Sequence, residues 1–179
     1  YDLAKEVFHI ERNILGETVG IQDQFAAAFG GFNFGTISPK GEVSLERISL
    51  SGARLRALSD RLIFVFTGAS RHASNVAATK VANFPTKQDA LRKMAQMAYK
   101  ARDILKEHRN LDEFGELLHE SWMLKRALSD QVSPAPIDAL YEEARRAGVI
   151  GGKLLGAGGS GFMMFFVPPE KRMDVVRAL

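Results

Sequence analysis

The spacing of hydrophobic residues alternates along this chain between strand-like and helix-like patterns. Short apolar segments, alternating or continuous, predict strands, whereas apolar residues at every third or fourth position predict helices. We expect strands over residues 32–38, 42–50, 62–67 and 161–167. We expect helices over residues 1–12, 25–29, 86–108, 111–130, 136–146 and 170–179. Strands in antiparallel succession beside separate helices predict an α+β protein.

Local signals refine several of these elements. Thr86 and Asp89 have the spacing of a capping box, which predicts a helix start at Thr86. Pro39-Lys40-Gly41 supplies a turn between the first two strands. The segment 161–167 is continuously apolar, which is typical of a strand that is buried on both faces, and the segment 62–67 predicts another buried strand.

The segment from residue 151 to 161, GGKLLGAGGSG, has the highest density of glycine in the chain. Glycine at such density is needed where the backbone turns at positive φ or approaches a ligand closely. A flexible linker is the alternative, but this segment leads directly into the apolar strand over 161–167. We therefore expect an ordered, tight loop between strands.

Composition limits the function classes. The 179 residues are 46% hydrophobic and 25% charged, which suits one globular domain or two small ones. The absence of cysteine excludes a disulfide framework, a zinc–thiolate site and a thiol nucleophile. The net charge of +3 is dispersed, which argues against nucleic acid as a partner and is compatible with small anionic substrates.

No apolar run approaches the ~20 residues that span a bilayer, and the first residues lack the pattern of a secretory signal. We expect no membrane partner and a cytoplasmic location. The sequence is also compatible with a homodimer. His9 and His72 have no metal-ligand spacing to another histidine, so the sequence identifies no metal site.

Two strings resemble the GHMP kinases, which phosphorylate small alcohols and sugars with ATP. KLLGAGGSGF at residues 153–162 resembles the third motif of that family, and GETVGIQDQFAAAFGGFNF at residues 16–34 resembles the segment of its sugar-kinase branch that carries the catalytic aspartate. The resemblance covers nearly the whole chain and is strongest to the D-glycero-D-manno-heptose 7-phosphate kinase type. It implies phosphorylation of the anomeric hydroxyl of a sugar or sugar phosphate, with ATP and Mg²⁺. A fucose- or galactose-type kinase is the alternative.

The same resemblance implies that residues 1–68 are the remainder of an N-terminal domain and residues 69–179 a ferredoxin-like C-terminal domain. The family's first motif and its upstream phosphate-binding loop, of the type PxxxGLGSSAA, have no match in this chain. Either the chain is a fragment of a longer kinase, or residues that precede it are omitted, or the gene product has lost its nucleotide site and is inert. The sequence leaves all three open.

Asp23 lies in the string GIQDQ at residues 20–24. The resemblance implies that Asp23 is the catalytic residue, orienting or deprotonating the attacking hydroxyl, and that Gly20 and Gln24 contact the substrate. The structural alternative is that Asp23 caps the short helix that follows, a position where aspartate is favoured.

The turn after the strand over 62–67 offers a second substrate contact. Its residues Thr67, Gly68 and Arg71 precede a helix, and a helix N-terminus attracts anions. Arg71 could bind a phosphate with two hydrogen bonds. A capped helix with a solvated arginine is the alternative.

The glycine loop supplies the phosphate-side residues that the resemblance implies: Gly156, Ala157, Gly158, Gly159, Ser160 and Gly161. Ser160 stands where the family usually has glycine. Lys153 faces the same cleft or is a solvated residue at a strand start, and Lys125 and Arg126 are weaker substrate-side candidates. Met94, Met97, Phe114 and Trp122 are best interpreted as core.

Overall fold

A computed structural model of the chain describes residues 1–68, 73–107 and 109–179. These residues form two compact units, Tyr1–Ser49 and Leu50–Leu179. The strand that we expected to close the first domain pairs with a strand of the second unit.

The first unit combines two helices with a β-hairpin. Helix α1 (Asp2–His9) continues into a π-helical turn (Ile10–Ile14), and α2 (Gln22–Phe29) follows. Strands β1 (Asn33–Ile37) and β2 (Val43–Arg47) pair antiparallel, as predicted. The helices contact each other through aromatic rings, with the Tyr1 and Phe25 centroids 5.4 Å apart.

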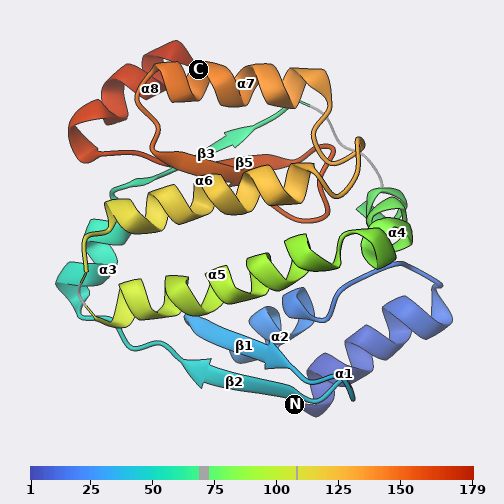
Figure 1. Ribbon diagram of the computed structural model, residues 1–179. Coiled ribbons are helices and arrows are strands. Elements are labelled where there is room, and N and C mark those ends of the chain that lie inside the picture. Colours follow the sequence, from blue (N-terminus) through green and yellow to red (C-terminus); the bar gives the residue numbers. More distant parts are fainter. Residues whose placement is uncertain (69–72, 108) are drawn as a thin grey trace. The chain divides into compact units, whose positions relative to one another are not determined.

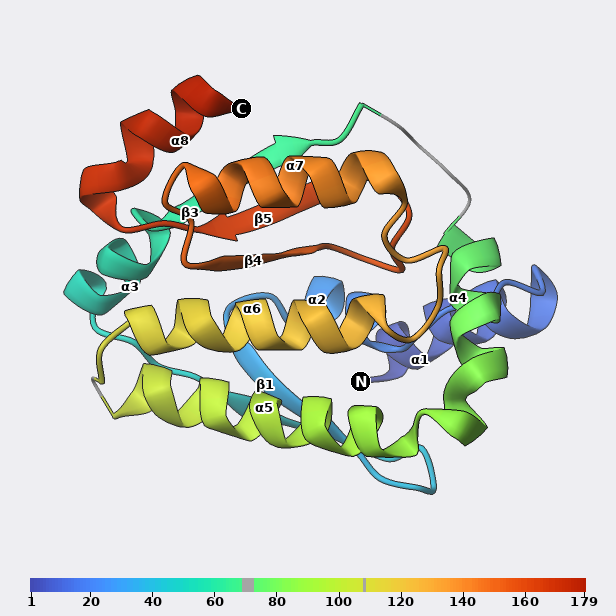
Figure 2. The same cartoon turned by 45° about the horizontal axis from the view of Figure 1, so that its top comes forward.

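The second unit is built on a three-stranded antiparallel sheet with the order β3-β5-β4. Strand β5 (Phe162–Phe166) lies between β3 (Leu62–Phe66) and β4 (Gly151–Leu154). The helices are α3 (Gly52–Ser59), α4 (Ala73–Asn83), α5 (Gln88–Lys106), α6 (Asp112–Arg126), α7 (Ala135–Arg146) and α8 (Arg172–Ala178), with 3₁₀ turns at Phe84–Thr86 and Pro169–Lys171. Helix α7 lies over one face of the sheet, α6 lies along the edge strand β4, and α5 lies beyond α6 (Figures 1 and 2). The α+β class is confirmed.

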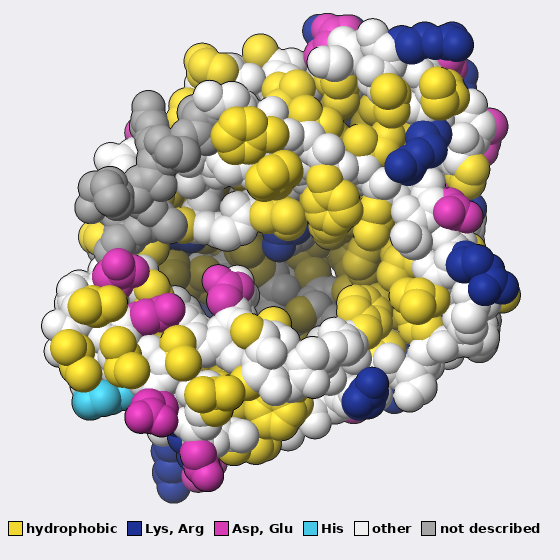
Figure 3. All heavy atoms as spheres, turned by 180° about the vertical axis from the view of Figure 1, so that it is seen from behind, with side chains coloured by type: hydrophobic (Ala, Val, Ile, Leu, Met, Phe, Trp, Pro, Cys, Tyr) yellow, Lys and Arg dark blue, Asp and Glu magenta, His cyan; other side chains and the backbone are white. Residues whose placement is uncertain are grey.

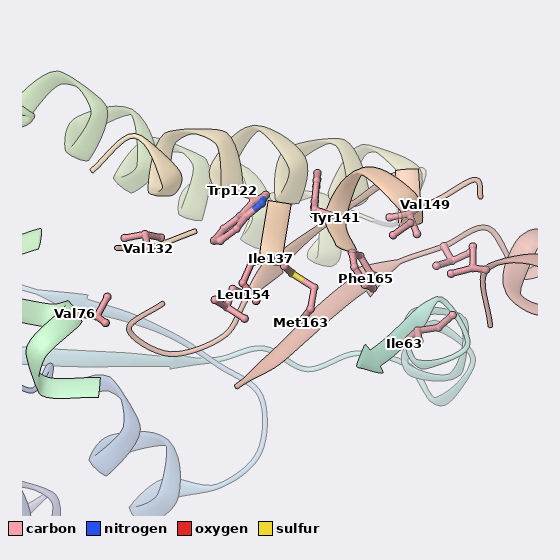
Figure 4. Packing of buried hydrophobic residues seen from close by; sticks show 13 residues of the cluster. Ile63, Val76, Trp122, Val132, Ile137, Tyr141, Val149, Leu154, Met163 and Phe165 are labelled. Atoms are coloured by element: carbon pink, nitrogen blue, oxygen red, sulfur yellow. The ribbon is translucent and has the colours of Figure 1, made fainter. Parts of the chain in front are cut away.

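The core of the second unit lies mainly between α7 and the sheet. Met163 and Phe165 alternate toward this side from β5 and pack with Trp122 of α6 and Tyr141 of α7, all four fully buried (Figure 4). Phe166 points to the other face, where it packs with residues of α3 and α5. The predicted burial of β5 on both faces is therefore confirmed for its second half.

Two glycines allow α6 to lie directly against β4. A Cβ atom on Gly151 would overlap the carbonyl oxygen of Gly115 and lie 2.8 Å from the amide nitrogen of His119. A Cβ atom on Gly115 would lie 2.6 Å from the Phe166 ring. Backbone packed this closely leaves no room for any side chain, so these glycines set the position of α6 against the sheet.

The expectation that β3 is a buried strand was wrong for one of its two faces. Phe64 and Phe66 are 54% and 55% exposed, and both lie on the same face of the strand. Hydrophobic side chains gather over this part of the second unit in Figure 3. The exposure belongs to this face of the sheet and not to the edge position of β3, because Phe162 of the central strand β5, which pairs with Phe66, is also 50% exposed.

Other boundaries also differ from prediction. Thr86 is not a helix cap, because its hydroxyl donates to the Asn83 carbonyl oxygen (3.0 Å) and closes a 3₁₀ turn, so that α5 begins at Gln88. Helix α3 was not predicted, although Ser51 caps it by accepting a hydrogen bond from the Arg54 amide (3.1 Å).

Candidate functional site

The glycine loop connects β4 to β5 and confirms the predicted tight turn between strands. Four of its residues have positive φ: Gly156 (66°), Gly158 (118°), Gly159 (79°) and Gly161 (105°). L-amino acids with a side chain are strained in this region, so glycine is required for the shape of the loop.

Thr67 fastens the end of β3 to the end of the loop. Its hydroxyl donates to the Gly161 carbonyl oxygen (2.9 Å) and accepts from the Gly161 amide (3.1 Å), while its own amide donates to the same carbonyl (2.9 Å). Two residues that were predicted separately from the sequence are thus in direct contact. This contact occupies the Thr67 hydroxyl with backbone groups.

The middle of the loop lies on the connection between α6 and α7. The Gly159 amide donates to the Val132 carbonyl oxygen (2.8 Å), and a Cβ atom on Gly158 would lie 3.0 Å from the Val132 Cα. The amides of Ala157, Gly158 and Ser160 make no hydrogen bond to any described residue. Together with the Gly156 amide, which also makes no hydrogen bond to a described residue, these are the donors that the loop can offer to a ligand.

Lys125 binds the start of the glycine loop through its ammonium group. Its side chain is buried, its Nζ donates to the carbonyl oxygens of Leu154 (2.8 Å) and Gly156 (2.7 Å), and it lies 5.9 Å from the centre of the Trp122 ring. Burial, together with the charges of two other lysines, lowers the pKa of Lys125 to about 7. Lys125 therefore holds the start of the loop and does not extend toward solvent.

Lys80 of α4 and Lys153 of β4 are the two lysines whose charges reach Lys125. Both are partly buried, and desolvation lowers the pKa of each, with the charge of Lys153 lowering that of Lys80 further. Lys153 is therefore not a fully solvated residue at a strand start. Sequence reasoning did not identify Lys80, whose signal was only its place in the helix after the Thr67 turn.

The Asp23 segment belongs to the first unit. Asp23 is exposed in the first turn of α2 and makes no hydrogen bond to a described residue. The cap position is occupied by Ile21 without a side-chain bond, so the interpretation of Asp23 as the cap is wrong. Gln24 is buried: its amide group donates to the Glu11 carboxylate, and its Oε1 has no partner among the described residues. Gly20 is exposed just before α2.

Gly68 has a positive φ of 76°, as a turn at the end of β3 requires. Arg71 lies outside the described residues. Arg126, the weaker candidate, is held by Asp138 at 2.9 Å.

One polar pair in the second unit was not predicted. The His119 ring nitrogen Nδ1 and the Tyr141 hydroxyl are 2.7 Å apart, and the rings stack. Burial raises the pKa of Tyr141 to about 12 and lowers that of His119, so both are neutral near pH 7. This pair joins α6 to α7 inside the unit.

In the described parts of the chain, no three His, Asp or Glu side chains gather where they could hold a metal ion. No helix in those parts combines the length and apolar character needed to cross a membrane.

The glycine loop joins antiparallel strands of a sheet that packs on helices. Residues 88–179 match the family model described as "GHMP kinases C terminal". The chain belongs to the GHMP kinase family.

Individual relatives agree with this assignment. The chain is 32% identical to the D-glycero-alpha-D-manno-heptose 7-phosphate kinase of Campylobacter jejuni, over 100% of this chain and 53% of that protein. It is 28% identical to the bifunctional fucokinase/GDP-fucose pyrophosphorylase of Arabidopsis thaliana, over 98% of this chain and 17% of that protein. The crystal structure of a D-glycero-D-manno-heptose 1-phosphate kinase from Bacteriodes thetaiotaomicron superposes with a TM-score of 0.74 at 29% identity, over 98% of this chain and 47% of that one. The chain thus spans about half the length of the heptose kinases it matches.

Proposed function

We propose that the protein containing this chain is an ATP-dependent sugar kinase that phosphorylates the anomeric hydroxyl of a sugar phosphate such as D-glycero-D-manno-heptose 7-phosphate. The observation that carries the proposal is the glycine loop, fixed at both ends by Thr67 and Lys125, in a chain similar to two heptose kinases. The similarity to a fucokinase supports a fucose-type sugar as the second candidate.

In this proposal Asp23 acts on the attacking hydroxyl. Its carboxylate is exposed and uncommitted among the described residues, so it can accept a hydrogen bond or the proton of a sugar hydroxyl. A positioned general base contributes about 10²- to 10⁴-fold in rate. Gly20 leaves the approach to this carboxylate without a side chain, and Gln24 is retained as a substrate-side residue although its Oε1 is buried.

The glycine loop acts on the phosphoryl group. The uncommitted amides of Ala157, Gly158 and Ser160 donate to its oxygens, which stabilises the charge carried by the transferring group. ATP supplies that group, and Mg²⁺ would neutralise its charge. We assign no metal ligand in this chain, because its described residues offer no suitable cluster.

The turn at Thr67 and Gly68, together with Arg71, completes the substrate side. We retain Arg71 as the residue that binds the phosphate already present on the sugar, through a bidentate hydrogen bond.

The test uses the full-length enzyme with Asp23→Asn, assayed for phosphate transfer to heptose 7-phosphate, fucose and galactose. We expect kcat to fall by at least ~10²-fold with the preferred sugar, in line with the loss of a general base. The matched control is Asp2→Asn, which changes an exposed aspartate in the first turn of α1 of the same unit and should retain activity. An unchanged kcat in Asp23→Asn removes the catalytic role, and no turnover of any of the three sugars by the native enzyme removes the proposal.

A further inference from the structure

Three lysines of the second unit form a cationic group that has no acidic partner among the described residues. They are Lys80, Lys125 and Lys153, contributed by α4, α6 and β4. None takes part in an ion pair, although the described surface of the same unit carries several. The group lies beside the first residue of the glycine loop, because Lys125 donates to the Gly156 carbonyl oxygen.

The three side chains differ in their hydrogen bonds. Lys125 is committed to two carbonyl oxygens and cannot move without releasing the start of the loop. Lys80 and Lys153 make no side-chain hydrogen bond to a described residue, so their ammonium groups keep their donors available. Lys80 follows Val76 by one turn of α4, and a Cβ atom on Gly159 of the loop would lie 3.1 Å from the Val76 side chain. Lys153 directly precedes Leu154, whose carbonyl oxygen accepts from Lys125. The pKa values of Lys125 and Lys80, which neighbouring lysine charges help to lower, agree with this grouping.

Partly buried cations that repel one another destabilise a fold unless something compensates their charge. No described carboxylate does so here. An anion bound between Lys80 and Lys153 would remove the repulsion, and it would lie next to a loop whose amides at residues 157, 158 and 160 are also without described partners. Ammonium groups and backbone amides together are typical of sites for phosphate oxygens.

We propose that Lys80 and Lys153, backed by Lys125, form a binding site for a phosphoryl group at the start of the glycine loop. The choice of a phosphoryl group rests on the proposed kinase function, whereas the anion site itself rests on the lysine group alone. The phosphoryl group belongs either to the polyphosphate of a nucleotide or to a sugar phosphate.

Calorimetric titration of the protein distinguishes these sources. The ligands are sodium tripolyphosphate and glucose 6-phosphate, with glucose and sodium chloride at matched ionic strength as controls. We expect saturable binding of at least one phosphate compound and none of glucose. Tighter binding of tripolyphosphate assigns the site to the nucleotide, and tighter binding of glucose 6-phosphate assigns it to the sugar substrate.

Charge-neutral variants locate the site. Lys80→Gln and Lys153→Gln should each weaken binding by about 10-fold or more, since a charge-assisted hydrogen bond is lost. Lys100→Gln is the matched control, because Lys100 is exposed on α5 of the same unit and changes the net charge equally. Lys153→Arg keeps the charge and should retain binding, which separates loss of a ligand contact from loss of the fold.

Trp122 gives a second readout, because the Lys125 ammonium lies close to its ring. Its emission, isolated by subtracting that of Trp122→Phe, should change with pH as Lys125 titrates. Bound phosphate should shift the midpoint to higher pH, because an anion favours the charged lysine. Absence of saturable binding, or equal weakening by Lys100→Gln, would overturn the proposal.

The proposed anion site and the proposed kinase activity can be refuted independently of each other. Asp23→Asn should bind tripolyphosphate or glucose 6-phosphate as the native protein does, whatever its activity. An active kinase with no anion effect at Lys80 and Lys153 removes the site alone, and anion binding in a protein without kinase activity removes the proposed function alone.

Discussion

Replacing Lys125 with methionine should change how stability depends on pH. The substitution shortens the side chain by one atom and removes its charge and its hydrogen-bond donors. In the folded protein the pKa of Lys125 is lowered from 10.5 to about 7 by burial and by the neighbouring lysines. At 1.36 kcal/mol per pKa unit, the charged form is disfavoured in the folded state by about 5 kcal/mol.

The sign follows from proton binding in the two states. Below pH 7 Lys125 is charged in both states, and the folded protein carries the full penalty. Between pH 7 and 10.5 the unfolded chain binds the extra proton, so the native stability rises with pH. From pH 7 to pH 9 this group should raise the unfolding free energy by about 2 kcal/mol relative to Lys125→Met.

The pH dependence, and not the absolute stability, is diagnostic. Methionine leaves the carbonyl oxygens of Leu154 and Gly156 without their donor, which costs about 1–3 kcal/mol each at every pH. Urea denaturation of both proteins at pH 6, 7, 8 and 9, followed by Trp122 fluorescence, gives the difference in unfolding free energy. The exposed Lys100→Met should parallel the native protein. A difference between native protein and Lys125→Met that stays constant from pH 7 to pH 9 would refute the reasoning.

Two further substitutions test the supports of the loop. Thr67→Val removes the hydroxyl that bonds to both backbone groups of Gly161. It should lower the free energy of unfolding by about 1–2 kcal/mol and speed hydrogen exchange of the Gly161 amide. Thr67→Ser keeps the hydroxyl and should keep the amide protected. Gly151→Ala drives a methyl group into the Gly115 carbonyl and should lower the unfolding free energy by about 3 kcal/mol or more. Gly52→Ala, whose added methyl meets only an ordinary contact at 3.5 Å, should be neutral or stabilising in the same denaturation measurement.

Features set by neighbouring residues could be predicted from the sequence. Gly30 ends α2 and Gly148 follows α7, as their places after apolar periodic segments indicated. The loop over residues 156–161 was also predictable, because its positive φ angles require the glycines that the sequence shows directly.

Features that depend on distant residues could not be predicted. An apolar run does not reveal which face of its strand stays uncovered, so the exposure of Phe64 and Phe66 became apparent only in the structure. The bonds of Lys125 reach residues 29 and 31 positions away, and nothing in the sequence around it signals them. The role of Thr86 was missed for the opposite reason, because its capping spacing competes with a local 3₁₀ turn.

The order of strands in the second sheet has a consequence for protein synthesis. Strand β5 is the last strand in the chain and the middle strand of the sheet, and the bond between Thr67 and Gly161 spans 94 residues. While the ribosome makes the intervening helices, β3 has no partner, and its apolar residues are exposed in the nascent chain. Contacts of such long range form slowly, and unpaired apolar strands promote aggregation. Slowing translation between residues 67 and 161 should therefore lengthen the time for which β3 stays unpaired and lower the yield of folded protein.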